Sequence, residues 1–214
     1  MSGRMTVMLV DDHAVVRAGY RLLLSQLADA DVVCEVDRGE AACQRYFEVM
    51  PTLVIMDLSL PGMGGLAAIR RICARDPLAR IVAFSIHDEP VYVKRTLEAG
   101  AKGYISKSCS PEVLIEAVRR VADGGSYLEP ALAQRLATDL GQTEGAAALN
   151  VLKPREFEVF RMLAWGHTTR EIAETLHMGY KTAANYSSII KTKLGVNTSA
   201  ELARLAFSAG VIKP

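Results

Sequence analysis

The stretch VIMDLSLPGMGG, residues 54–65, decides the fold class, because a short apolar run ends there in an acidic residue, Asp57, followed by a turn rich in glycine. Short runs of this kind recur along the first ~125 residues, with helical patterns between them. Strands that are apolar on both faces are typical of a parallel sheet covered by helices on each side. The alternation predicts an α/β domain with a five-stranded, doubly wound parallel sheet. The runs are 6–10, 32–36, 53–56, 81–84 and, more weakly, 103–105.

The chain changes character after this domain, which we place at residues 1–125. Residues 126–149 are rich in glycine, alanine and polar residues and are predicted to be a linker, with room for a helix over 129–140. Residues 150–214 carry only helical patterns, and they are predicted to form a small all-α domain. In this part Gly166 ends one helix, and the capping boxes Thr168-x-x-Glu171 and Thr198-x-x-Glu201 begin two others.

Charge is distributed unevenly between these parts. The whole chain has a formal net charge of +1, but residues 150–214 contain nine Lys/Arg and five Glu, a net +4, which leaves −3 for the rest. A small basic unit attached to a larger acidic one is consistent with a nucleic-acid partner. No apolar run approaches the ~20 residues of a membrane span, and no signal-peptide pattern precedes the first strand.

The cysteines are scattered and form no Cys-x-x-Cys pair, so we expect reduced thiols and a cytoplasmic protein. They are Cys34, Cys43, Cys73 and Cys109.

Polar residues follow successive strands of the predicted sheet. Asp11 and Asp12 follow the first strand, Asp57 the third and Ser85 the fourth, and Lys107 lies just past the fifth. Carboxyl ends of parallel strands share one edge, and the strand order 2-1-3-4-5 makes the first and third strands neighbours. Three carboxylates that close repel one another unless a cation intervenes, and an all-oxygen site suits Mg²⁺.

This cluster predicts phosphoryl transfer to a carboxylate. Asp57 is the candidate nucleophile, Lys107 and the metal would neutralise the phosphoryl oxygens, and Ser85 would donate a hydrogen bond. Each residue also has a structural interpretation: Asp11 or Asp12 as a helix cap, Asp57 as a turn residue, Lys107 as a surface lysine. Their occurrence at successive strand ends favours the functional one.

The segments LVDDH, VIMDLSLPGMGG, AFSIHD and GYISK together resemble the receiver domain of response regulators, and DDHAVVRAG resembles the NarL/FixJ subfamily. This resemblance covers the whole N-terminal part. It implies that a sensor histidine kinase phosphorylates Asp57. It further implies that Asp12 and Asp57 bind Mg²⁺ with the Ser59 carbonyl oxygen, that Asp11 assists, and that Ser85 and Tyr104 are the switch residues.

Residues 168–178 and 180–194 have the lengths of a helix-turn-helix. The stretch from Leu152 to Val196 resembles the LuxR-type DNA-binding domain, although Lys153, Gly179 and Ala183 stand where that family usually has Thr, Ser and Val. The resemblance implies that 180–194 enters the major groove of double-stranded DNA and that 199–209 helps to form a homodimer. Lysines are expected to contact phosphates, and Asn185 and Ala184 to read bases. The candidate DNA contacts are Lys181, Thr182, Ala184, Asn185, Ser188, Lys191 and Lys193.

These patterns predict a two-component response regulator, a transcription factor rather than an enzyme. A phosphatase of the haloacid dehalogenase type also uses Asp and Mg²⁺, but that class has D-x-D after its first strand, where this chain has LVDDH. A second alternative is a receiver whose helical domain binds a protein partner instead of DNA, since the recognition face carries few charges.

Overall fold

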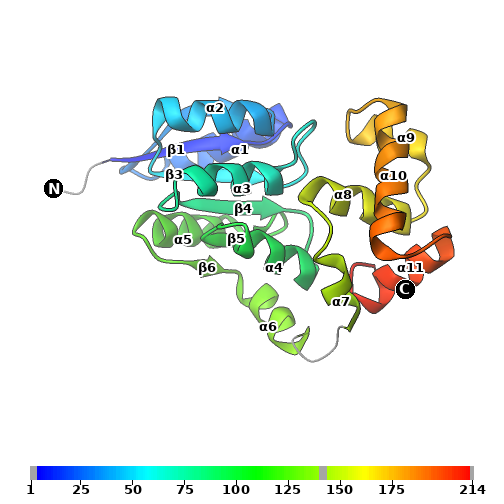
Figure 1. The fold of residues 1–214 in the computed structure, drawn as a ribbon. Coiled ribbons are helices and arrows are strands. Elements are labelled where there is room, and N and C mark those ends of the chain that lie inside the picture. The colour runs from blue at the N-terminus through cyan, green and yellow to red at the C-terminus, as the bar shows by residue number, and fades with distance from the viewer. Residues whose placement is uncertain (1–3, 140–143, 213–214) are drawn as a thin grey trace. The chain divides into compact units, whose positions relative to one another are not determined.

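The computed structural model describes residues 4–139 and 144–212 (Figure 1). The chain divides into two compact units. The first contains Met1–Asp88 and Tyr92–Gln134, and the second contains Glu89–Val91 and Arg135–Pro214. No helix in the described residues is long and apolar enough to cross a membrane.

The first unit is built on a parallel sheet with the strand order β2-β1-β3-β4-β5-β6. The predicted order 2-1-3-4-5 is confirmed, and the sheet has a sixth strand beyond the five that were predicted. The sixth strand has only two residues, too few to show a periodic pattern, and it lies at the edge of the sheet beside β5. The strands are β1 (Met5–Val10), β2 (Ala30–Val36), β3 (Leu53–Asp57), β4 (Ile81–Ser85), β5 (Gly103–Ser106) and β6 (Tyr127–Leu128).

Helices cover both faces of this sheet (Figure 1). One core cluster joins α1 and α5 to one face, where Leu24 and Val118 pack with strand residues such as Leu9 and Ile55. Residues that alternate with these, such as Met8 and Met56, are also fully buried, as expected for a sheet covered on both sides. The helices are α1 (Ala14–Ser25), α2 (Gly39–Val49), α3 (Gly65–Arg75), α4 (Pro90–Glu98) and α5 (Pro111–Ala122).

The segment 126–149, predicted as linker, contains β6 followed by α6 (Pro130–Asp139) and α7 (Glu144–Leu149). The helix expected at 129–140 is therefore present, and it begins at Pro130, where a missing N–H costs nothing. The first compact unit ends inside this segment, at Gln134 on α6.

In the described part of the second unit, four further helices surround a core that includes Phe157, Phe160, Ile190 and Leu202, all fully buried. The Thr168 and Thr198 hydroxyls accept the N–H groups of Glu171 and Glu201, so both predicted capping boxes are confirmed. Gly166 follows the end of α8 with φ of 89°. The helices are α8 (Pro154–Ala164), α9 (Thr169–Thr175), α10 (Tyr180–Leu194) and α11 (Ser199–Ser208).

Candidate functional site

The acidic residues at the ends of β1 and β3 lie together. Asp11, Asp12, His13 and Asp57 each offer a ligand atom, and these atoms lie within 4.8 Å of one another. Asp11 and Asp57 are buried, and Asp11 Oδ1 accepts the backbone N–H of His13 over 2.8 Å as the chain enters α1. Strand adjacency in a parallel sheet thus brings carboxylates 46 positions apart in the sequence into one cluster.

Lys107 bridges the two buried carboxylates. Its Nζ lies 2.7 Å from Asp11 Oδ2 and 2.7 Å from Asp57 Oδ2. Burial raises the pKa of the Asp57 carboxyl, and Lys107 only partly offsets that effect. Burial alone would lower the pKa of Lys107, but Asp57 and Asp11 reverse this and raise it. The lysine therefore remains an ammonium that stabilises two carboxylates which would otherwise repel each other.

The donor set at this edge fits a hard divalent cation. Asp12 Oδ1 is buried and accepts no hydrogen bond within the described residues, although His13 Nδ1 lies 2.8 Å away. A buried carboxylate oxygen that accepts no hydrogen bond is costly unless a cation binds it. Oxygen ligands from Asp12 and Asp57 are those that Mg²⁺ prefers. His13 would be a poor ligand for that ion, but it lies within the same cluster.

Ser59 and the predicted switch residues border the cluster. The Ser59 N–H donates to Asp57 Oδ1 over 3.0 Å. Ser85 is fully buried at the end of β4, and its Oγ accepts the N–H of His87 over 3.1 Å. Tyr104 on β5 is also fully buried, and its hydroxyl donates to the carbonyl oxygen of His87 over 2.7 Å. The two predicted switch residues are thus connected through the backbone of His87.

His87 is the residue at this site that the sequence analysis did not single out. It is buried, its Nε2 lies 3.3 Å from Ser59 Oγ, and its ring stacks on Tyr92 at 4.5 Å between centroids. The available signal was its position two residues after Ser85 in the segment AFSIHD, although a histidine in a loop carries little information about its contacts.

The candidate recognition residues lie along α10. Lys181, Asn185 and Ser188 are exposed, as is Thr182, whereas Ala184 and Lys191 are partly buried. As predicted, Gly179 is the N-cap residue before this helix, and it provides no side-chain cap. The buried face is represented by Ala183 and Ile190, so the remaining face is available to a ligand.

Lys193 is placed differently from the other candidates. Its Nζ lies 2.7 Å from Oε2 of Glu156, which is buried, and 3.3 Å from the carbonyl oxygen of Val151. Glu156 also accepts the N–H of Lys153, the N-cap residue before α8, whose own side chain makes no capping hydrogen bond. Despite burial, Lys193 and Lys153 lower the pKa of Glu156. Lys193 is exposed, as Lys181 is, but its ammonium has a structural partner in Glu156.

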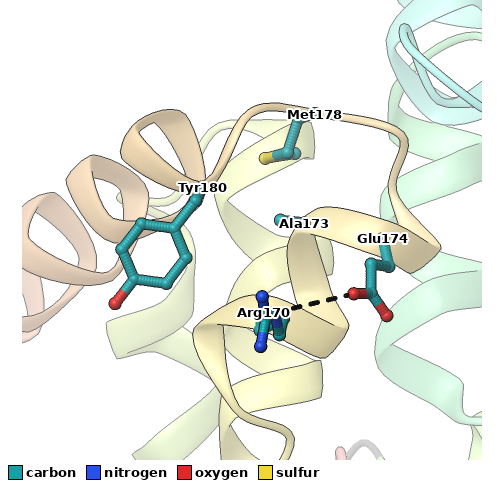
Figure 2. A pocket seen from close by; sticks show the side chains of 5 residues that line it. All are labelled: Arg170, Ala173, Glu174, Met178 and Tyr180. Atoms are coloured by element: carbon teal, nitrogen blue, oxygen red, sulfur yellow. Dashed lines mark ion pairs between the residues drawn. The ribbon is translucent and has the colours of Figure 1, made fainter.

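A pocket of about 490 Å³ opens between α9 and the start of α10. Figure 2 shows Arg170 and Glu174 on α9 beside Tyr180, the first residue of α10. Tyr180 is 62% exposed, and Arg170 forms a long 3.9 Å ion pair with Glu174. These side chains extend the polar and aromatic surface around the N-terminus of α10. The residues that line the pocket are Arg170, Ala173, Glu174, Met178 and Tyr180.

Comparison with protein families identifies both units. Residues 7–119 match the response regulator receiver domain, and residues 150–206 match the bacterial regulatory proteins of the luxR family. The chain belongs to the response-regulator family. It combines a receiver domain with a LuxR-type DNA-binding domain, and it is therefore a transcriptional response regulator.

Several known proteins resemble this response regulator over their full length. The transcriptional activator protein ExaE of Pseudomonas putida is 44% identical over 211 residues, covering 98% of this chain and 99% of that protein. RcsB of Salmonella enterica serovar Typhimurium, solved bound to promoter P1flhDC with the phosphomimetic BeF3-, is 26% identical with a TM-score of 0.65, covering 96% and 100%.

A solved LuxR-family response regulator from Aurantimonas sp. SI85-9A1 is 39% identical with a TM-score of 0.62, and it covers 64% of this chain and 98% of its own.

Proposed function

We propose that Asp57 accepts a phosphoryl group from a sensor histidine kinase and that this modification controls binding of α10 to double-stranded DNA. The observation that carries the proposal is the position of Asp57. It is buried at the end of β3, 2.7 Å from the Lys107 ammonium and within one cluster with Asp11 and Asp12.

In the proposed step a carboxylate oxygen of Asp57 attacks the phosphorus of the kinase phosphohistidine. An oxygen–phosphorus bond forms, the phosphorus–nitrogen bond breaks, and the imidazole leaves with the electron pair. Asp12, Asp57 and the Ser59 carbonyl oxygen would hold Mg²⁺, which supplies positive charge for the phosphoryl oxygens. Lys107 can move from its bridge between the carboxylates to pair with one of those oxygens.

Phosphorylation of Asp57 would also change the hydrogen bonds of the two predicted switch residues, Ser85 and Tyr104. Ser85 Oγ accepts the N–H of His87, and its hydroxyl hydrogen would be donated to the new phosphoryl group. The bond from Tyr104 to the His87 carbonyl couples that movement to β5. The transfer modifies the protein itself, and we propose no separate substrate, so this regulator is not an enzyme in the usual sense.

For DNA binding, we propose that Lys181, Thr182 and Lys191 contact phosphates while Ala184, Asn185 and Ser188 face base edges in the major groove. RcsB, which has the same fold, was solved bound to a promoter, and this supports the groove-binding role of α10. We further propose that α11 contributes to a homodimer on DNA and that the protein acts in the cytoplasm.

The test uses intact mass after incubation with acetyl phosphate and Mg²⁺. Wild-type protein should gain one phosphate, and Asp57→Asn should gain none, whereas Asp37→Asn, at an exposed acid after β2, should behave as wild type. Phosphate on Asp57→Asn at the wild-type rate would refute the assignment. In an electrophoretic mobility-shift assay titrated with salt, phosphorylated protein should bind DNA. If it shifts no DNA tested, a protein partner for the helical domain is favoured.

A further inference from the structure

The segment that leaves the receiver domain is hydrogen-bonded to the strand that carries Tyr104. Gly103 pairs with Tyr127 and Tyr104 pairs with Leu128 in the β5–β6 register. The Glu129 N–H continues this ladder by donating to the Tyr104 carbonyl oxygen over 3.2 Å. The short strand therefore attaches the chain leading to α6 directly to one of the switch residues.

Glu129 also reaches toward the phosphorylation site with its side chain. Its Oε2 accepts the backbone N–H of Ser106 over 2.8 Å. Ser106 immediately precedes Lys107, whose own N–H donates to the Ser85 carbonyl oxygen over 2.8 Å. The carboxylate of Glu129 thus fixes the backbone one residue before the lysine that pairs with Asp57.

We propose that Glu129 is a positioning residue for Lys107 and that it couples the chemistry at Asp57 to the start of α6. This inference rests on the proposed phosphorylation of Asp57. A hydrogen bond from an amide to a carboxylate is shorter and stronger than a neutral one, so it can hold the β5–α5 loop in place. Phosphorylation draws the Lys107 ammonium toward a phosphoryl oxygen. The adjacent backbone at Ser106, which Glu129 holds, then shifts with the lysine.

The start of α6 is connected to the same residue. The Glu129 carbonyl oxygen accepts the N–H of Leu132 over 2.9 Å, and the Leu132 side chain is buried. A change at Ser106 therefore reaches both β6 and the first turn of α6. Because Glu129 holds the backbone beside Lys107, weakening its contact with Ser106 should misplace the lysine and slow the phosphorylation of Asp57.

Glu116 on α5 provides a matched comparison. Its Oε2 accepts the hydroxyl of Tyr127 over 3.3 Å, so it also contacts β6 through one carboxylate. This contact does not involve Ser106 or the loop that carries Lys107. Loss of Glu116 weakens β6 without removing the acceptor of the Ser106 N–H.

The experiment compares the full-length wild type with Glu129→Ala, Glu129→Gln and Glu116→Ala. The rate of phosphorylation by acetyl phosphate with Mg²⁺ is followed by intact mass, and thermal unfolding checks that each variant is folded. We expect Glu129→Ala to be roughly tenfold slower, because small misplacements of a reacting group can cost up to about 100-fold. Glu129→Gln keeps an oxygen acceptor and should restore most of the rate, and Glu116→Ala should match wild type.

A wild-type rate in Glu129→Ala would overturn the inference, as would equal slowing in Glu116→Ala. If the wild type itself gained no phosphate on Asp57, the proposed function would fail and the inference with it, which is a different result. Should Glu129→Ala not fold, hydrogen exchange on wild type decides. Phosphorylation must change exchange at Ser106 and in the first turn of α6, and unchanged exchange at both would overturn the inference.

Discussion

The carboxylate cluster and the recognition helix hold their side chains in different ways. In the cluster, Lys107, Asp11 and Asp57 are 15%, 5% and 1% exposed, and each holds another in place. On α10, Lys181 and Asn185 are exposed to solvent. Chemistry needs charges that are fixed before the substrate arrives, whereas DNA recognition needs side chains that remain available to a partner. Substitutions in the cluster should therefore alter stability as well as chemistry, and substitutions of Lys181 or Asn185 should alter binding alone.

The largest effect is expected from Lys107→Met. Removing one partner from a buried charge cluster typically costs about 3–5 kcal/mol, and urea unfolding at neutral pH should show a loss of that order. Lys102→Met, at an exposed lysine before β5, is the control and should cost little. A loss no larger than that of the control would mean that the cluster is not held by its lysine.

The same variant predicts a pH dependence. Burial raises the pKa of Asp57, and without Lys107 the shift should grow. A carboxyl whose folded pKa exceeds its unfolded value binds more protons in the folded state, so the protein gains stability as pH falls through that range. The deficit of Lys107→Met should therefore shrink at acidic pH, and adding Asp57→Asn should reduce it at neutral pH. A deficit that grows as the pH falls would contradict this account.

An intermediate effect is expected at the base-reading surface. Asn185→Ala should lose about 1–3 kcal/mol of discrimination at one base pair while binding to random DNA stays nearly constant. Selection of bound sequences from a random pool, compared with the control Asn197→Ala beyond the end of α10, measures this directly. If Asn185→Ala selects the same bases as wild type, Asn185 does not read a base pair. Thermal stability of both variants should match wild type.

The smallest effect separates two lysines of one helix. Lys181 is exposed, and replacing it with Ala should flatten the slope of log affinity against log salt by about 0.9 per protomer. Lys193 pairs with buried Glu156, so Lys193→Ala should leave the slope unchanged and lower the stability of the second unit. If Lys193→Ala also flattens the slope of log affinity against log salt, Lys193 contacts a DNA phosphate after all.

The sequence predicted much of this arrangement because successive strand ends carried unusual residues. Asp11, Asp57 and Lys107 could be placed at one edge from strand order alone, and the helix-turn-helix followed from capping boxes and helix lengths. The contacts of Glu129 and His87 could not be predicted. A two-residue edge strand leaves no periodic signal, and the partner of a loop residue depends on tertiary packing. For the same reason the partner of Lys193 emerged only from the folded structure.

The central claim is that phosphorylation of Asp57 controls DNA binding by α10, and one titration tests it most directly. Wild type and Asp57→Asn are each incubated with and without acetyl phosphate and Mg²⁺, and affinity for a selected DNA sequence is measured at fixed salt. We predict that the phosphodonor tightens binding of wild type by at least fivefold, the lower range of typical allosteric coupling at about 1 kcal/mol, and leaves Asp57→Asn unchanged. Equal affinities for wild type in both conditions, or the same gain in Asp57→Asn, would contradict the account.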